Sequence, residues 1–124
     1  MVEALPFQAL MYDLETIPDL SPVICPPYDV ISDQMRKHLY QKNPFNVVRL
    51  EYSQETDSHQ DRYDQAAQDL QNWIGQGVLK PTERASFYLL TQSYRDGYGA
   101  QRIRKVLIAR VRLAKFSEGS VLPH

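Results

Sequence analysis

One stretch determines how the first half of the chain is expected to fold: Val23-Ile24-Cys25-Pro26-Pro27-Tyr28-Asp29-Val30-Ile31. Two prolines in series fix φ at about −65° and supply no N–H donors, and each disfavours the helical region for the residue before it. The segment is therefore predicted to run extended and to present Tyr28 and Asp29 from a stiff base. Two interpretations stay open: a preorganised ligand-binding loop, or a pinned loop that only delivers the chain into a helix.

The residues that follow predict a helix over Asp33–Gln41. Ser32 is a good N-cap, and Asp33 places a negative charge in the first turn, where the helix dipole favours it. The helix must end before Pro44, because proline disfavours the helical region for its predecessor.

The clearest helical pattern covers Gln60–Gly75, where apolar and aromatic residues recur at helical spacing. Asp57 or Ser58 can cap its start. Gly75 and Gly77 are candidates for the residue just after the helix, since glycine accepts a positive φ without steric cost.

The strand signals lie on either side of that helix. Asn46–Tyr52 alternates apolar and polar residues, which predicts a half-buried strand. Ser86–Tyr94 is rich in β-prone residues, and the turn signal Asp96–Gly99 leads into a return strand over Gln101–Leu113. Leu5–Leu10 is predicted as a short strand or an extended entry, and Pro6 favours an edge position. The even positions of the return strand carry Arg102, Arg104, Arg110 and Arg112.

These elements predict an α+β domain in which two helices pack on a small, mostly antiparallel sheet. The 124 residues suit a single domain, residues 1–124, and an apolar content of 43% can support a core. The predicted core residues are Val48, Leu50, Tyr63, Ala67, Leu70, Trp73, Leu89, Ile103 and Leu107.

Composition excludes several classes of protein. No apolar run approaches the roughly 18 residues of a membrane span, and the N-terminus lacks the basic start of a signal peptide. Cys25 is the only cysteine, so an internal disulfide and a cysteine-cluster zinc site are excluded. We therefore expect a cytoplasmic protein. The net charge of −1 favours neither nucleic acid nor a membrane surface as a partner.

A series of motifs follows in a specific order: Pro26-Pro27-Tyr28-Asp29-Val30-Ile31, Asn43-Pro44-Phe45-Asn46, Arg49-Leu50-Glu51, Tyr63-x-x-Ala66, Trp73, Gly77-Val78-Leu79, Gln92-Ser93-Tyr94 and Pro123-His124. In these motifs the chain resembles the N-terminal part of the bacterial and archaeal domain-of-unknown-function family 1015, over nearly its whole length. Members of that family are longer. The resemblance therefore implies that residues 1–124 are the N-terminal portion of a larger domain, whose missing C-terminal part is an expected partner.

The resemblance transfers no activity, no cofactor and no decision on whether the protein is an enzyme. Family members often stand beside genes for serine biosynthesis, a context that implies a small phosphorylated or anionic metabolite as ligand but no mechanism. Arginine suits such a ligand, because its planar fork contacts phosphate or carboxylate with two hydrogen bonds. No metal site is predicted. The candidate ligand-binding residues are Tyr28, Asp29, Arg49, Arg102, Arg104 and His124.

Two alternatives remain. The arginine-rich strand would give a basic stripe of roughly 30 Å at ~3.3 Å per residue, beside which tyrosines could stack bases as in a nucleic-acid-binding module. The net charge and the lack of a recognised motif argue against nucleic acid. The other alternative is a structural or interaction segment whose active site lies in the missing C-terminal part.

Overall fold

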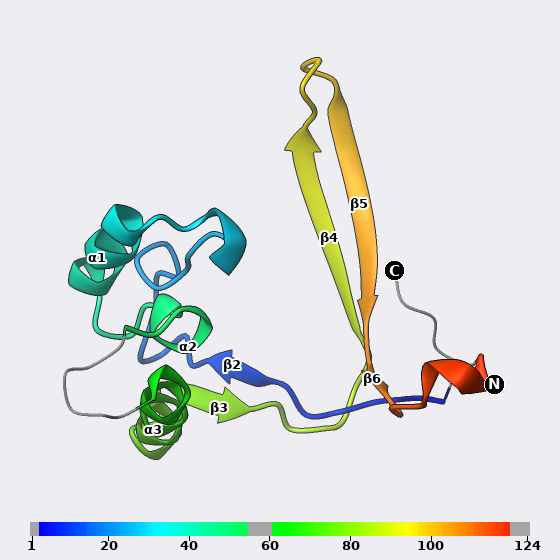
Figure 1. Cartoon of the computed structure of the whole chain (residues 1–124), viewed down its shortest axis with the longest axis horizontal. Helices are drawn as coiled ribbons and strands as arrows, with labels where there is room; N and C mark the ends of the chain where they lie inside the picture. Colours follow the sequence, from blue (N-terminus) through cyan, green and yellow to red (C-terminus); the bar gives the residue numbers. More distant parts are fainter. Residues whose placement is uncertain (1–2, 55–60, 120–124) are drawn as a thin grey trace. The chain divides into compact units, whose positions relative to one another are not determined.

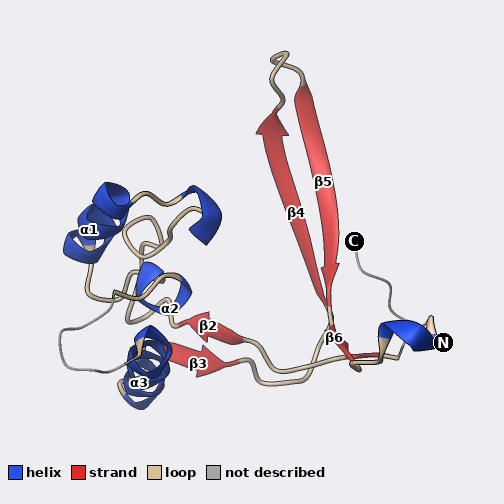
Figure 2. Cartoon of the chain, in the orientation of Figure 1, coloured by secondary structure: helices blue, strands red, loops and turns tan. Residues whose placement is uncertain are grey.

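The computed structural model describes residues 3–54 and 61–119. The chain forms two compact units, Leu10–Lys80 and the combination of Met1–Ala9 with Pro81–His124. Helices and small two-stranded sheets confirm the α+β class (Figures 1 and 2). The first unit holds the 3-10 turn η1 (Tyr28–Val30) and the helices α1 (Asp33–Lys42), α2 (Val48–Glu51) and α3 (Arg62–Gly75).

Helix α1 begins where the sequence predicts. The backbone N–H of Met35 donates to the Ser32 hydroxyl at 3.2 Å, so Ser32 is the N-cap. The helix runs to Lys42, one residue past the predicted end, and Asn43 is already extended in front of Pro44. Its inward face buries Leu39.

The predicted strand Asn46–Tyr52 is wrong, since this segment contains the short helix α2. The side-chain oxygen of Asn46 accepts a hydrogen bond from the Val48 N–H at 3.0 Å, and the Glu51 N–H donates to the Val47 carbonyl at 3.0 Å. An asparagine that satisfies a nearby N–H in this way favours a turn over a strand ladder. Over a single turn, the alternating pattern does not distinguish the two structures.

The amide of Asn46 also ties α2 to the loop that precedes the proline pair. Asn46 is fully buried, and its Nδ2 donates to the carbonyls of Pro22 at 2.9 Å and Ile24 at 3.0 Å. Beside it, the Val47 N–H donates to the Val23 carbonyl at 2.7 Å. These bonds hold residues 22–24 against the start of α2.

Helix α3 is capped by Asp61, whose carboxylate accepts from the Tyr63 N–H at 3.4 Å. The predicted caps Asp57 and Ser58 lie outside the described residues, and the observed cap shows that this prediction was wrong.

The end of α3 confirms Gly77 as the residue with positive φ, at 71°. Its N–H donates to the Ile74 carbonyl at 3.0 Å, and the Val78 N–H donates to the Trp73 carbonyl at 2.9 Å. These are the two bonds of a Schellman motif, and the apolar contact that often accompanies them is made by Trp73 and Val78, which share a core cluster.

The core of this unit consists of two clusters. The indole of Trp73 is the largest group in one of them, with the ring of Phe45 at 5.8 Å and that of Tyr12 at 6.3 Å between centroids. The first cluster contains Ile17, Val23, Trp73, Val78 and Leu79, and the second contains Ile31, Leu39 and Val48.

The predicted core is only partly confirmed. Val48 and Trp73 are buried, while Leu50 and Leu70 are half-buried against the first cluster. The remaining predicted core residues are exposed, because α3 buries a narrower stripe than its pattern suggests and no described layer covers the later strands. They are Tyr63, Ala67, Leu89, Ile103 and Leu107.

The strands form three separate pairs rather than one sheet. The return strand breaks at Ala109, because its first part pairs with β4 and its second part with β1. The pairs are β1 (Ala4–Leu5) with β6 (Arg110–Val111), β2 (Leu10–Tyr12) with β3 (Leu79–Pro81), and β4 (Tyr88–Arg95) with β5 (Gln101–Ile108).

The turn between β4 and β5 confirms the signal Asp96–Gly99. The Asp96 carboxylate accepts from the backbone N–H groups of Tyr98 and Ala100, both at 3.0 Å, and Gly99 has φ of 81°. Arg102 donates to the same carboxylate at 2.8 Å. These bonds lower the pKa of Asp96, with the arginine as the largest cause.

We predict that Trp73→Ala lowers the free energy of unfolding by about 3–5 kcal/mol, because it removes the largest buried ring and leaves a cavity. Trp73→Phe serves as the control and should cost less, since it keeps an aromatic ring in the cluster. Urea unfolding measures both, and an unchanged midpoint for Trp73→Ala would contradict the packing described above.

We predict that Asn46→Ala lowers the free energy of unfolding by about 2–4 kcal/mol, since three hydrogen bonds at about 1 kcal/mol each are lost and the buried N–H of Val48 is left unsatisfied. Asn43→Ala is the matched control: the Asn43 side chain accepts one bond, from the Phe45 N–H at 2.8 Å. Equal losses in the two variants would show that the Asn46 amide has no special role.

Candidate functional site

A cavity of about 570 Å³ lies within the unit Leu10–Lys80. Its walls come from η1, from the end of α2 with the residues after it, and from the first turns of α3. Apolar groups and titratable groups both line it. The lining residues are Tyr28, Asp29, Ile31, Leu50, Glu51, Tyr52, Ser53, Arg62, Tyr63 and Ala66.

The proline pair builds the first wall. Pro27 is extended, with φ of −54° and ψ of 144°, and its carbonyl accepts from the Val30 N–H at 3.1 Å to start the turn η1. Ile31 closes that turn and is buried, so it anchors the loop while Tyr28 and Asp29 stay exposed at the cavity. The predicted stiff base is thus confirmed, with a short 3-10 turn at its end.

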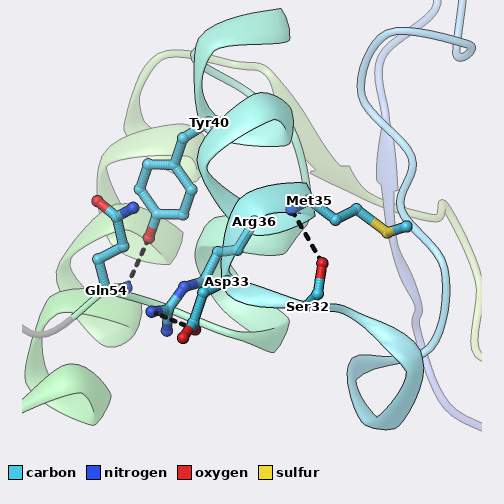
Figure 3. Close-up of polar contacts among 6 residues, drawn as sticks. All are labelled: Ser32, Asp33, Met35, Arg36, Tyr40 and Gln54. Carbon is cyan, nitrogen blue, oxygen red and sulfur yellow. Dashed lines mark hydrogen bonds and ion pairs between the residues drawn. The ribbon is translucent and has the colours of Figure 1, made fainter.

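Helix α1 holds in place the wall formed by the end of α2 and the residues after it. The backbone N–H of Gln54 donates to the Tyr40 hydroxyl at 2.8 Å (Figure 3). The guanidinium of Arg36 lies 4.5 Å from the centre of the Tyr52 ring and forms an ion pair with Asp33 at 3.1 Å. The residues on both sides of Ser53 are therefore fixed to α1.

Ser53 has an unusual environment. It is 4% exposed, and its hydroxyl has no hydrogen-bond partner in the described part of the chain. A buried polar group without a partner costs about 1–3 kcal/mol, and such groups usually have a functional or solvent explanation. Ser53 is also one of the residues that line the cavity.

The charged side chains that line the cavity differ in their hydrogen bonds to the rest of the protein. The carboxylates of Asp29 and Glu51 make no hydrogen bond or ion pair with any residue of 3–54 or 61–119. Arg62 is the cation of the lining, and it donates to the Tyr63 hydroxyl at 2.9 Å with its guanidinium 4.9 Å from the ring centre. The lining thus presents two carboxylates and one guanidinium.

The surroundings of Cys25 disfavour its thiolate. Burial raises the pKa of its thiol, and the negative charge of Glu51 raises the pKa further. The thiol is therefore protonated at neutral pH, and the reactive thiolate is disfavoured.

Residues 3–54 and 61–119 contain neither a candidate metal site nor a candidate membrane-spanning helix. No group of three or more histidine, cysteine, aspartate or glutamate side chains is placed to hold a metal ion there. Nor does that part of the chain contain a helix with the length and apolar character needed to cross a membrane.

The structure brings two of the predicted site residues together, since Tyr28 and Asp29 line the same cavity. Arg49 does not line it. Its guanidinium lies 4.2 Å from the centre of the Tyr40 ring and donates to the Tyr40 carbonyl at 3.3 Å. Arg49 therefore braces α2 against α1.

The two predicted arginines of β5 lie outside the unit that holds the cavity. Arg102 and Arg104 are on β5, in the unit that contains Pro81–His124, and Arg102 is paired with Asp96. His124 lies outside the described residues.

Sequence reasoning missed Glu51, Ser53 and Arg62 as cavity residues, and it assigned Tyr63 to the core. A usable signal was present, since three of the quoted motifs contribute to the cavity: the proline motif, Arg49-Leu50-Glu51 and Tyr63-x-x-Ala66. Ser53 and Arg62 belong to none of these motifs.

The family described as Protein of unknown function (DUF1015) matches the chain over residues 4–124, which confirms the resemblance seen in the motifs. No curated protein and no solved structure matches the chain.

We predict that Glu51→Gln lowers the pKa of Cys25, because the neighbouring negative charge that disfavours the thiolate is removed. The rate of Cys25 alkylation by iodoacetamide at mildly alkaline pH should rise relative to the unaltered protein. Asp33→Asn, which removes an acidic charge that does not act on the thiol, should leave the rate unchanged. A Glu51→Gln protein that reacts no faster would place Glu51 too far from the thiol to matter.

Proposed function

Because the chain belongs to the DUF1015 family, whose description assigns no activity, we propose a function from the cavity: the protein binds a small polar metabolite there. One observation carries the proposal. Ser53, whose buried hydroxyl has no partner in the described part of the chain, lines the same cavity as Asp29 and Glu51, whose carboxylates have no partner there either. No reaction or cofactor is part of the proposal.

The size and lining of the cavity support this proposal. Small-molecule sites usually have volumes of roughly 300–1,000 Å³, with apolar walls and a few placed polar groups. The volume here is about 570 Å³, and Ile31, Leu50 and Ala66 supply apolar wall between the polar side chains. A metabolite of the size of an amino acid or a sugar phosphate would fit.

The charges favour a ligand that carries an amine. Asp29 and Glu51 offer acceptors to an ammonium group, and hydrogen bonds of this charged kind are stronger than neutral ones. Arg62 offers the cation for an acidic group. The ligand we propose is therefore an amino acid or a derivative of one, with its amine at the two carboxylates and its acid group at the guanidinium.

The anionic or phosphorylated ligand expected from the sequence is compatible with this proposal only in part. A phosphorylated amino acid would meet Arg62 with its acidic end and the carboxylates with its amine. A purely anionic metabolite would face two carboxylates and one guanidinium, and like charges without compensation repel. The amine is thus the group that should decide affinity.

The tyrosines of the cavity add to the same preference. Tyr28, Tyr52 and Tyr63 all contribute to its lining. The face of an aromatic ring attracts a cation, with about 0.5–2 kcal/mol gained according to exposure. An ammonium group held by Asp29 and Glu51 could gain from such a ring as well.

The nucleic-acid alternative gains no support from the described strands. Its basic stripe is divided between two ladders, since Arg102 and Arg104 stand on β5 while Arg110 belongs to β6. Arg102 is held by Asp96 and Arg112 lies 3.8 Å from a carboxylate oxygen of Glu3.

Matched pairs of probes test the proposal. O-phosphoserine and L-serine carry an amine, whereas 3-phosphoglycerate and glycerate have a hydroxyl in its place. Titrations followed by amide NMR should give saturable shifts around Asp29 and Ser53 with the first pair, and much weaker ones with the second. Asp29→Asn and Ser53→Ala should weaken binding roughly tenfold or more, as expected for loss of a hydrogen bond to a charged group.

Glu83→Gln is the control variant, because Glu83 is an exposed acid outside the cavity and its replacement should leave binding unchanged. Equal affinity for phosphoserine and phosphoglycerate would remove the role of the amine and keep an anion site. Failure of all four probes to saturate would count against a metabolite of this class in the cavity.

A further inference from the structure

The hairpin of β4 and β5 leaves the outer edge of each strand without a strand partner in the described chain (Figure 1). A two-stranded hairpin alone is marginally stable in water. Its open edges present unpaired N–H and C=O groups, which are a template for another strand.

The two edges differ in charge. Strand β5 carries Arg102, Arg104 and Lys105, whereas β4 has no charged residue between Tyr88 and Tyr94. Charged side chains on an edge strand, lysine above all, are a common means of preventing further pairing. The outer edge of β4 is therefore the one suited to accept a strand.

Both faces of the hairpin are apolar near its base. Residues directly opposite each other share a face, so the pair Leu89 and Leu107 lies on one face and the pair Leu90 and Val106 on the other. Leu89 and Leu107 are 67% and 65% exposed. Antiparallel sheets with one wet face normally alternate apolar and polar residues, so this hairpin has the composition of strands inside a larger sheet.

We propose that β4 pairs with β4 of a second copy of this chain, antiparallel and centred on Thr91. This register places Tyr88 of one copy opposite Tyr94 of the other, and Leu89 opposite Ser93. In this register, residues on one face of the first hairpin lie opposite residues on the same face of the second hairpin. The two-residue period of a strand requires this match. The result is a four-stranded sheet in the order β5, β4, β4, β5.

Three features favour a second copy as the occupant of this edge. The uncharged stretch Tyr88–Tyr94 is centred on Thr91 and has a tyrosine at each end, so it complements itself under a twofold axis. Its aromatic pairs would add cross-strand contact. The cations of β5 would stand on both outer edges of the four-stranded sheet, where they oppose further addition and end the assembly at a dimer.

Cysteine trapping tests this register. In a Cys25→Ser background, Thr91→Cys should form a disulfide-linked dimer under mild oxidation, because residues opposite each other in an antiparallel pair lie about 4.5–5.5 Å apart at Cα, within the range of a disulfide. Lys105→Cys is the matched control on the protected strand of the same hairpin, and it should stay monomeric under the same conditions. If the Lys105→Cys protein were trapped as readily as the Thr91→Cys protein, the register would be overturned.

A second measurement tests the interface without oxidation. Thr91→Lys would bring two cations together at the centre of the pair, so sedimentation should show dissociation of the dimer at protein concentrations where the unaltered chain is dimeric. A monomeric unaltered chain would overturn the pairing.

Discussion

The side-chain amide of Asn46 is the interaction on which the unit Leu10–Lys80 depends. Its Nδ2 reaches the carbonyls of Pro22 and Ile24, and its oxygen receives the N–H of Val48. One buried group thus fixes the loop before the proline pair and the first turn of α2 to each other. The turn η1 follows this loop, and Glu51 is the last residue of α2. The same amide therefore sets the relation between two walls of the cavity.

In this unit, the side chains that hold the cavity walls differ from those proposed to bind a ligand. The residues that hold the walls are engaged with the protein: Tyr40 accepts from Gln54, and Arg36 stacks on Tyr52. Asp29 and Glu51 face the cavity with no partner in the described chain. Unpaired polar groups beside well-braced walls are the arrangement that a preorganised site requires, since the protein then pays little to order them when a ligand arrives.

Local chemistry accounts for what the sequence could predict. Ser32, Gly77 and the turn at Asp96 were recognised because caps and turns depend on residues a few positions apart. Helix α2 was missed because an alternating pattern over a single turn does not distinguish a strand from a helix, and the two bonds from Asn46 to carbonyls more than twenty residues away cannot be inferred from spacing. Tyr28 and Asp29 could be found from the proline pair, whereas Ser53 depends on bracing by α1, which no spacing reveals. An apolar pattern on β4 and β5 likewise identifies faces without showing whether anything covers them.

The arginines of β5 illustrate how a residue type changes meaning with its place in a fold. Read along the sequence, Arg102 and Arg104 suggest contacts to an anionic ligand, because arginine is well shaped for one. In the hairpin they stand on β5, whose neighbour β4 has no charged residue from Tyr88 to Tyr94, and Arg102 also closes the turn through Asp96. A ligand site does not require one strand to be charged and its neighbour to be uncharged. Control over which edge pairs with another strand does require it. The cavity and the hairpin therefore call for separate explanations, the first in the chemistry of a small molecule and the second in the specificity of a sheet edge.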